Sequence, residues 1–225
     1  MAPIRDKQLI LFDLDGTLVD SVPDLALAVD GMLVQLGKTP AGEEKVRCWV
    51  GNGARSLVLR ALADDITGDE PGRLTETEFE QASPLFLAAY QAATAAARSS
   101  LYPDVLETLS ELRLRRMKLA CITNKPARFT EPMLEQLGLS SFFDVVLSGD
   151  SLTNKKPHPE PLLHVAEHYE MDVANTLMVG DSSNDVKAAR AAGMDVACVR
   201  YGYNHGQSIE DSEPDWVIDS FTELL

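Results

Sequence analysis

Apolar and polar positions divide the chain into two stretches of different character. The apolar run over 9–12 is short, ends at an acidic residue and predicts a buried strand. From Ser21 to about Ser100, the apolar residues recur only at helical spacing. Beyond that point, short apolar runs alternate with amphipathic segments. This alternation is typical of a parallel sheet with helices on both of its faces.

Turn residues and helix-capping residues set the expected boundaries of these elements. In the first stretch, helices are expected over 22–36, 54–66 and 76–97, and Pro84 should divide or kink the last of them. The strands expected later are 117–123, 143–147, 176–179, 195–199 and 216–218, and the helices expected between them are 104–115, 127–137, 160–169 and 184–192.

The all-helical stretch falls between the first sheet strand and the other strands. This order predicts an α/β fold with a doubly wound, Rossmann-like parallel sheet and a helical domain inserted in it. The expected core domain comprises residues 1–18 and 100–225, and the expected helical cap domain comprises residues 19–99.

The composition limits the binding partners and the cellular compartment that can be expected for this protein. The 225 residues carry a formal charge of −15, so neither a nucleic-acid backbone nor an anionic membrane is an expected partner. The three cysteines form no metal-binding pair or disulfide framework, and no signal peptide or membrane-spanning run is evident, so a cytoplasmic protein is expected. An anionic substrate would need local positive charge from a metal ion or a few lysines.

Two acids stand at the end of the first strand. Asp13 and Asp15 are two residues apart, so strand geometry would place their carboxylates side by side, which costs energy unless a cation neutralises them. The alternative is that Asp15 and Gly16 merely form a turn, which Asp13 caps. The full string Asp-Leu-Asp-Gly-Thr-Leu-Val-Asp after an apolar strand is much rarer than an Asp-Gly turn, and favours chemistry.

Further polar residues follow the other predicted strands, and ligands of parallel sheets bind beyond the carboxyl ends of the strands. Each group alone could be a helix cap or a solvated charge. Together they offer hard oxygen ligands for Mg²⁺ and hydroxyl, amide and ammonium donors for phosphoryl oxygens. These groups are Thr123-Asn124-Lys125, Lys155-Lys156 and the run from Asp181 to Asp185.

This set of motifs strongly resembles the haloacid dehalogenase superfamily of phosphohydrolases, in the subgroup with a helical type 1 cap. The resemblance covers nearly the whole chain. It implies that Asp13 is the nucleophile, that Asp15 is the general acid and base, and that Lys156 neutralises charge on the nucleophile and on the phosphoryl oxygens. It also implies that Thr123 binds the phosphoryl group, with Asn124 behind it. The neighbouring Lys155 is set aside only because the Lys-Pro-x-Pro match begins at Lys156.

The same resemblance implies a Mg²⁺ cofactor. Its ligands would be Asp13, the backbone carbonyl of Asp15, and Asp181, with Asp185 acting directly or through water. The reaction would pass through an aspartyl-phosphate on Asp13, which water then hydrolyses.

Members of the superfamily differ in substrate. The dehalogenases lack an acid at the position of Asp15, so dehalogenation is not expected here. The phosphonatases use a cap lysine, but the cap contains only Lys38 and Lys45, which are better interpreted as solvated charges, so phosphonate cleavage is not expected either. Several segments, among them 50–54 and 201–206, resemble bacterial phosphatases that act on 2-phosphoglycolate. In the cap, Gly53 could bring backbone amides close to a small substrate and Arg55 could bind its carboxylate, although Arg55 could equally be a surface helix charge.

The expected function is therefore Mg²⁺-dependent hydrolysis of a small phosphorylated metabolite, 2-phosphoglycolate, to glycolate and phosphate. A sugar-phosphate phosphatase or phosphomutase, or a pyrophosphatase, on the same scaffold remains open, as does a silent binding module. The intact set of buried charges argues against the silent module. The sequence does not indicate an oligomeric state.

Overall fold

The computed structural model describes residues 4–225, and the chain divides into two compact units. The core unit contains the chain up to Val19 and again from Leu101 to Leu225, and the helical unit contains Asp20–Ser100. Two very short strands, β2 (Val19–Asp20) and β3 (Ser100–Leu101), pair with each other where the chain passes between the units.

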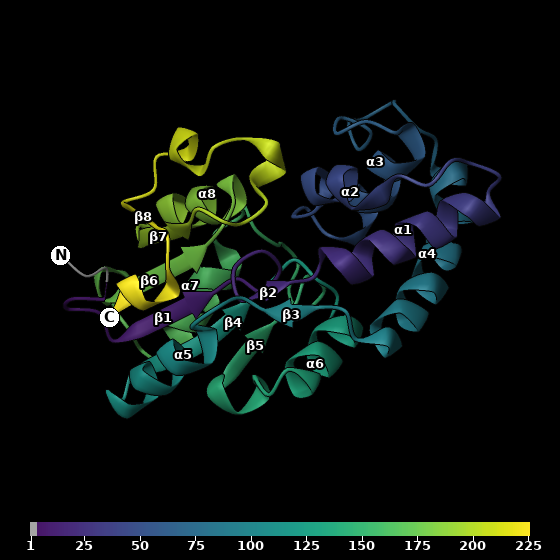
Figure 1. Ribbon diagram of the computed structural model, residues 1–225. Helices are drawn as coiled ribbons and strands as arrows, with labels where there is room; N and C mark the ends of the chain where they lie inside the picture. The colour runs from purple at the N-terminus through teal and green to yellow at the C-terminus, as the bar shows by residue number, and fades with distance from the viewer. Residues whose placement is uncertain (1–3) are drawn as a thin grey trace. The chain divides into compact units, whose positions relative to one another are not determined.

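The core unit is built on a six-stranded parallel sheet with the order β5-β4-β1-β6-β7-β8 (Figure 1). Its central strand β1 pairs with β4 on one side and with β6 on the other. The predicted doubly wound α/β fold is confirmed. The strands are β1 (Leu9–Phe12), β4 (Lys118–Ile122), β5 (Val145–Leu147), β6 (Thr176–Gly180), β7 (Asp195–Val199) and β8 (Trp216–Ile218).

Alternation along each strand explains why helices cover both faces of the sheet. In β1, Ile10 and Phe12 belong to one hydrophobic cluster, whereas Leu9 and Leu11 belong to another. The first cluster includes residues of α5 (Val105–Leu114) and α6 (Ala127–Gln136), and the second includes residues of α7 (Glu160–His168) and α8 (Ser183–Ala192). The chain order reverses at β1, and such a switch point is where doubly wound sheets bind ligands.

Four helices form the helical unit: α1 (Val22–Gln35), α2 (Gly42–Trp49), α3 (Ala54–Ala63) and α4 (Glu76–Ala96). Helix α2 was not predicted, because it is short and mostly polar, and only Val46 and Trp49 of its eight residues are buried. The expected division at Pro84 is wrong, since α4 continues through this residue, whereas the kink that was the other expectation stays a prediction. The loss of one backbone hydrogen bond is offset by packing of the next turns, where Phe86 and Tyr90 are buried and stacked.

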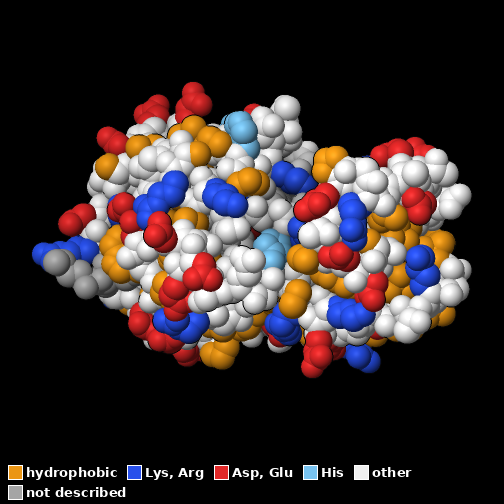
Figure 2. Space-filling model, turned by 90° about the horizontal axis from the view of Figure 1, so that it is seen from above, with side chains coloured by type: hydrophobic (Ala, Val, Ile, Leu, Met, Phe, Trp, Pro, Cys, Tyr) orange, Lys and Arg blue, Asp and Glu red, His pale blue; other side chains and the backbone are white. Residues whose placement is uncertain are grey.

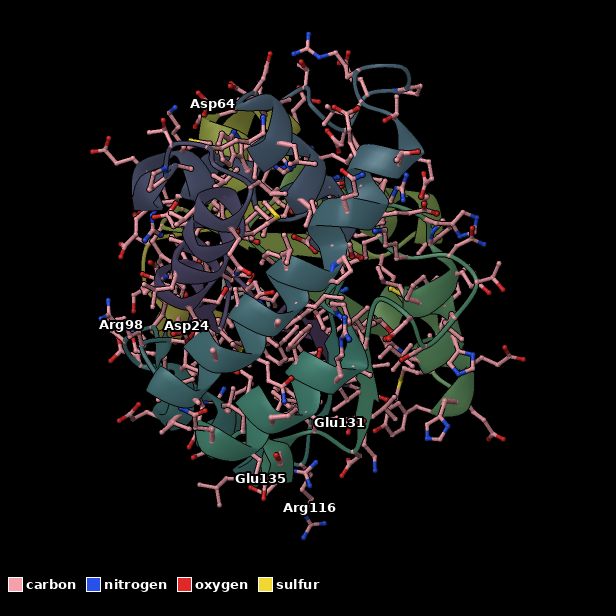
Figure 3. All side chains as sticks on the ribbon, turned by 90° about the vertical axis from the view of Figure 1, so that its right-hand side faces the viewer. Asp24, Asp64, Arg98, Arg116, Glu131 and Glu135 are labelled. Atoms are coloured by element: carbon pink, nitrogen blue, oxygen red, sulfur yellow. The ribbon has the colours of Figure 1, made fainter. Side chains whose placement is uncertain are left out.

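A buried carboxylate connects the two ends of the helical unit. Asp24, in the first turn of α1, is 1 % exposed and accepts hydrogen bonds from the backbone of Arg98 and from the backbone and hydroxyl of Ser99. Figure 3 shows Asp24 and Arg98 close together. The segment that leaves α4 is thus attached to the helix that begins the unit. Short 3-10 helices complete the core unit at Ser140–Phe142, Val173–Asn175, Asn204–Gly206, Ile209–Ser212 and Phe221–Leu224.

No helix of residues 4–225 combines the length and apolarity needed to cross a membrane. On the face drawn in Figure 2, lysine and arginine side chains are interspersed with acidic, apolar and neutral ones.

Candidate active site

Three of the predicted site residues directly follow neighbouring strands of the core sheet. Asp13 follows β1 and continues its ladder, because its N–H donates to the Val179 carbonyl of β6 at 2.9 Å. Thr123 follows β4 in the same manner, with its N–H 2.9 Å from the Leu147 carbonyl of β5. Asp181 directly follows β6. The sheet order β4-β1-β6 therefore brings together residues from distant parts of the sequence.

Lys156 lies between two of the carboxylates. Its Nζ donates to Asp13 Oδ1 and to Asp185 Oδ1, both at 2.7 Å, and its side chain is 2 % exposed. Asn124 holds the loop that carries Lys156, since its Nδ2 donates to the Lys156 carbonyl at 2.9 Å. Lys155 is exposed, so the lysine that enters the cluster is the one indicated by the motif.

Asp185 is also engaged through its second oxygen. It closes a capping box at the start of α8, where Oδ2 accepts from the backbones of Asp181 and Ser182 and from the Ser182 hydroxyl. Asp181 accepts from the Tyr203 backbone at 2.7 Å and, more weakly, from the Thr17 hydroxyl at 3.4 Å. Both oxygens of Asp181 and of Asp185 thus have partners within the protein, and whether Asp185 ligates the metal directly or through water stays a prediction.

Three glycines make room for these acids. A Cβ atom on Gly16 or on Gly202 would lie 2.1 Å from an atom of Asp181, and one on Gly180 would lie 2.3 Å from Asp185. Gly16 also has a φ of +90°, which favours glycine. The loop over 201–206, whose sequence resembles that of the family, therefore packs directly on Asp181 through Gly202 and Tyr203.

The crowding of buried acids changes their ionisation. Burial is the main cause that raises the pKa of Asp13 to about 7, and the charge of Lys156 opposes it only in part. Burial, followed by the nearby charge of Asp13, also raises the pKa of Asp181. Burial alone would lower the pKa of Lys156, but the carboxylates of Asp13 and Asp185 outweigh it and raise this pKa above its ordinary value. The cluster therefore holds more negative charge than its lysine neutralises.

This cluster fits a hard divalent cation. Asp13, Asp181 and Asp185 each offer a carboxylate oxygen, and these oxygens lie within 4.8 Å of one another. All the donors are oxygens, as Mg²⁺ prefers. A divalent charge would also relieve the repulsion that raises the pKa values of Asp13 and Asp181. Ligation by the backbone carbonyl of Asp15 stays a prediction.

Thr123 and Asp15 are two further predicted residues of the core site. Thr123 is 4 % exposed, and its Oγ1 accepts from the Lys125 N–H at 3.1 Å, so its hydroxyl hydrogen remains available for a phosphoryl oxygen. Asp15 is paired with the Nζ of Lys125. From the sequence, Lys125 was expected at this strand end, but no individual role was predicted for it. Its position two residues after Thr123 was the signal that could have identified it.

The cap candidates belong to the helical unit. Gly53 is the N-cap residue of α3 and has a φ of +89°, so it occupies a conformation that favours glycine. Arg55 forms two hydrogen bonds with Glu76, at 3.0 and 2.5 Å, and lies 4.1 Å from the centre of the Phe79 ring. These contacts are those of a surface helix charge, the alternative that the sequence left open. The roles of Gly53 and Arg55 in binding stay predictions.

The arrangement in the core unit suits phosphoryl transfer. A carboxylate that could attack phosphorus is buried beside a lysine, a hydroxyl and a cation-binding group of acids. A second carboxylate, that of Asp15, lies two residues further along and is partly exposed, so it can exchange a proton with a substrate or with water.

Known proteins share this sequence and fold. The chain matches the family described as haloacid dehalogenase-like hydrolase over residues 10–199. It is 49 % identical to a phosphoglycolate phosphatase of Nitrosococcus oceani, with 98 % of this chain and 96 % of the relative covered. It is also 49 % identical to phosphoglycolate phosphatase 1 of Pseudomonas aeruginosa, with 98 % and 79 % covered.

A crystal structure from Haemophilus somnus, described as a predicted phosphoglycolate phosphatase, has a TM-score of 0.89 and 40 % identity, and the match covers 98 % of this chain and 97 % of that one. The resemblance derived from the four motifs is thereby confirmed. The extent of these matches, together with the convergence of the motif residues at one end of the sheet, shows that this chain is an enzyme that belongs to the haloacid dehalogenase-like hydrolase family.

Proposed function

We propose that this protein is a Mg²⁺-dependent phosphatase that hydrolyses 2-phosphoglycolate to glycolate and inorganic phosphate through an aspartyl-phosphate on Asp13. The observation that carries the proposal is the pairing of the buried Asp13 with Lys156 at 2.7 Å, beside the acids Asp181 and Asp185. The two relatives at 49 % identity that bear the name phosphoglycolate phosphatase support the choice of substrate.

In the first step, an oxygen of Asp13 attacks phosphorus as the bond to the glycolate oxygen breaks. Asp15 gives its proton to that oxygen, so glycolate leaves as the alcohol. Lys156 holds Asp13 in place and offsets the charge of the incoming phosphoryl oxygens, and the Thr123 hydroxyl donates to one of them. When bound, Mg²⁺ supplies positive charge that reduces the repulsion between the anionic substrate and Asp13.

In the second step, the now ionised Asp15 takes a proton from water. The resulting hydroxide attacks phosphorus, the bond between phosphorus and the Asp13 oxygen breaks, and phosphate leaves. Asp13 is again a carboxylate and Asp15 is again an acid, so both return to their starting states. An aspartate can act as a nucleophile here because the neighbouring positive charges screen the phosphate.

The test is phosphate release from 2-phosphoglycolate, several sugar phosphates and pyrophosphate, with Mg²⁺ or with EDTA. We expect release from 2-phosphoglycolate to exceed the others by far and to require the metal. A preference for a sugar phosphate or for pyrophosphate would assign one of those substrates instead. Absence of EDTA-sensitive release from every substrate would indicate a silent binding module.

The covalent step has its own test. Asp13→Asn should abolish turnover while leaving the circular dichroism spectrum unchanged. In the unaltered protein, rapid acid quenching during turnover should trap a phosphorylated species, detected as the gain of one phosphoryl group in intact mass. Near-normal activity of Asp13→Asn, or the same mass gain in that variant, would contradict an aspartyl-phosphate on Asp13.

A further inference from the structure

Lys125 is a second buried lysine in the core site, and its partner is the proposed acid and base. Its side chain is 3 % exposed, and its Nζ lies 3.0 Å from Asp15 Oδ1 and 3.2 Å from Asp15 Oδ2. Charge-assisted hydrogen bonds of this kind are about twice as strong as neutral ones. A contact to both oxygens also restricts rotation of the Asp15 carboxyl group.

The backbone of Lys125 is held at three points. Its N–H donates to the Thr123 hydroxyl at 3.1 Å, and its carbonyl accepts from the Gly149 N–H at 2.8 Å and from the Thr130 hydroxyl at 3.2 Å. Gly149 allows this close approach, because a Cβ there would lie 2.2 Å from the Asn124 carbonyl oxygen. Lys125 is therefore a fixed anchor and not a mobile surface lysine.

The two buried lysines divide the carboxylates between them. Lys156 contacts Asp13 and Asp185, whereas Lys125 contacts Asp15. Charge neutralisation at the nucleophile is thus already supplied by Lys156. The contacts of Lys125 are therefore suited to orienting the carboxyl group of Asp15.

We propose that Lys125 is a positioning residue that holds the Asp15 carboxyl group toward the leaving oxygen of the substrate. The inference rests on the proposed function, because the proton transfer by Asp15 belongs to it. When one Asp15 oxygen carries the proton, the other still accepts from Lys125, so the ammonium neither gains nor loses a proton in either step. Lys125 acts through Asp15 and does not touch the reacting phosphorus.

A leaving-group comparison isolates this role. Departure of an alkoxide from ethyl phosphate needs a proton from Asp15, whereas p-nitrophenolate leaves from p-nitrophenyl phosphate with little help. The value of kcat/KM reports the steps up to release of the alcohol or phenol. We expect Lys125→Met to lower kcat/KM for ethyl phosphate by about 10- to 100-fold and for p-nitrophenyl phosphate by less than about threefold.

Two further variants complete the design. Lys125→Arg keeps the charge and should recover part of the lost activity on ethyl phosphate. Lys118→Met is the matched control, because Lys118 is exposed and lies at the opposite end of β4, and it should leave the ratio of the two kcat/KM values unchanged. If circular dichroism shows that Lys125→Met is unfolded, Lys125→Gln takes its place in the same comparison.

An equal loss on both substrates, or a rise in KM alone, would overturn the positioning role. This failure is distinct from failure of the proposed function. In the first case the unaltered protein still hydrolyses both esters and loses activity through Asp13→Asn. In the second case, the unaltered protein releases no phosphate from 2-phosphoglycolate, or Asp13→Asn releases it at the same rate.

Discussion

Replacement of Asp13 by asparagine should abolish catalysis and yet stabilise the metal-free protein at alkaline pH. Burial raises the pKa of Asp13 from 3.8 to about 7. The folded state therefore holds a proton that the unfolded chain releases near pH 4. The contribution of this proton to the free energy of unfolding is fully present below about pH 4 and is lost progressively as the pH rises to about 7.

The magnitude follows from this shift. Each pKa unit corresponds to 1.36 kcal/mol, so the difference between 3.8 and about 7 amounts to about 4 kcal/mol above pH 8. Asparagine resembles the protonated acid and removes the penalty. The figure is an upper bound, since Asp181 shares the same crowding. For a chain of this length, about 2 kcal/mol already raises the unfolding midpoint by roughly 4 °C.

The assay is thermal and urea unfolding followed by circular dichroism, in EDTA, at pH 8 and at pH 4.5. We expect Asp13→Asn to be more stable than the unaltered protein at pH 8, and this advantage to shrink to about 1 kcal/mol at pH 4.5. Mg²⁺ should stabilise the unaltered protein more than the variant. Asp211→Asn, which alters an exposed carboxylate, is the matched control and should leave the free energy of unfolding unchanged at both pH values.

A variant that is no more stable than the unaltered protein at pH 8 in EDTA would refute the argument. It would mean that the attraction between Asp13 and Lys156 outweighs the cost of burying the carboxylate. An equal advantage at both pH values would also refute it, because the effect would then not arise from ionisation.

Two further substitutions test the packing around the site and within the helical unit. Gly202→Ala should weaken Mg²⁺ binding at least about tenfold in calorimetric titration, because the added Cβ would displace Asp181. Gly37→Ala is the control: nothing lies near its Cβ, so it should bind Mg²⁺ normally despite the positive φ of Gly37. Unchanged affinity in Gly202→Ala would count against the role of Asp181 as a ligand. Asp24→Ala should cost about 3 kcal/mol, because it leaves the buried donors of Ser99 unpaired, and should speed tryptic cleavage after Arg98. Cleavage at the original rate would show that Asp24 does not hold this segment.

Much of the fold was predictable because its signals are local. The apolar run over 9–12 indicated a buried strand, and alternating strands and helices indicated a parallel sheet. The weak point was the helical unit. Helix α2 is short and mostly polar, with only two buried residues, so it offers few apolar positions from which to predict it. Helix α4 continues through Pro84 because packing in the neighbouring turns offsets the lost hydrogen bond.

The chemistry of the site was also largely present in the sequence. The spacing of Asp13 and Asp15, and the acids after β6, indicated a cation and a phosphoryl group, since parallel strands deliver their carboxyl ends to one edge. Side-chain pairing was not determined in this way. Which acid each lysine contacts depends on how the fold brings together residues that are far apart in the sequence. Lys125 and Asp15, for example, are 110 residues apart.

The sequence by itself thus determined the doubly wound sheet, the inserted helical stretch and the residue types available for phosphoryl transfer. The tertiary structure alone decided that Lys156 also contacts Asp185, that Lys125 contacts Asp15, and that Gly202 packs against Asp181. The physical reason is that periodicity and strand ends are properties of neighbouring residues. Burial, ionisation and ion pairing depend instead on distances that exist only after the strands have assembled.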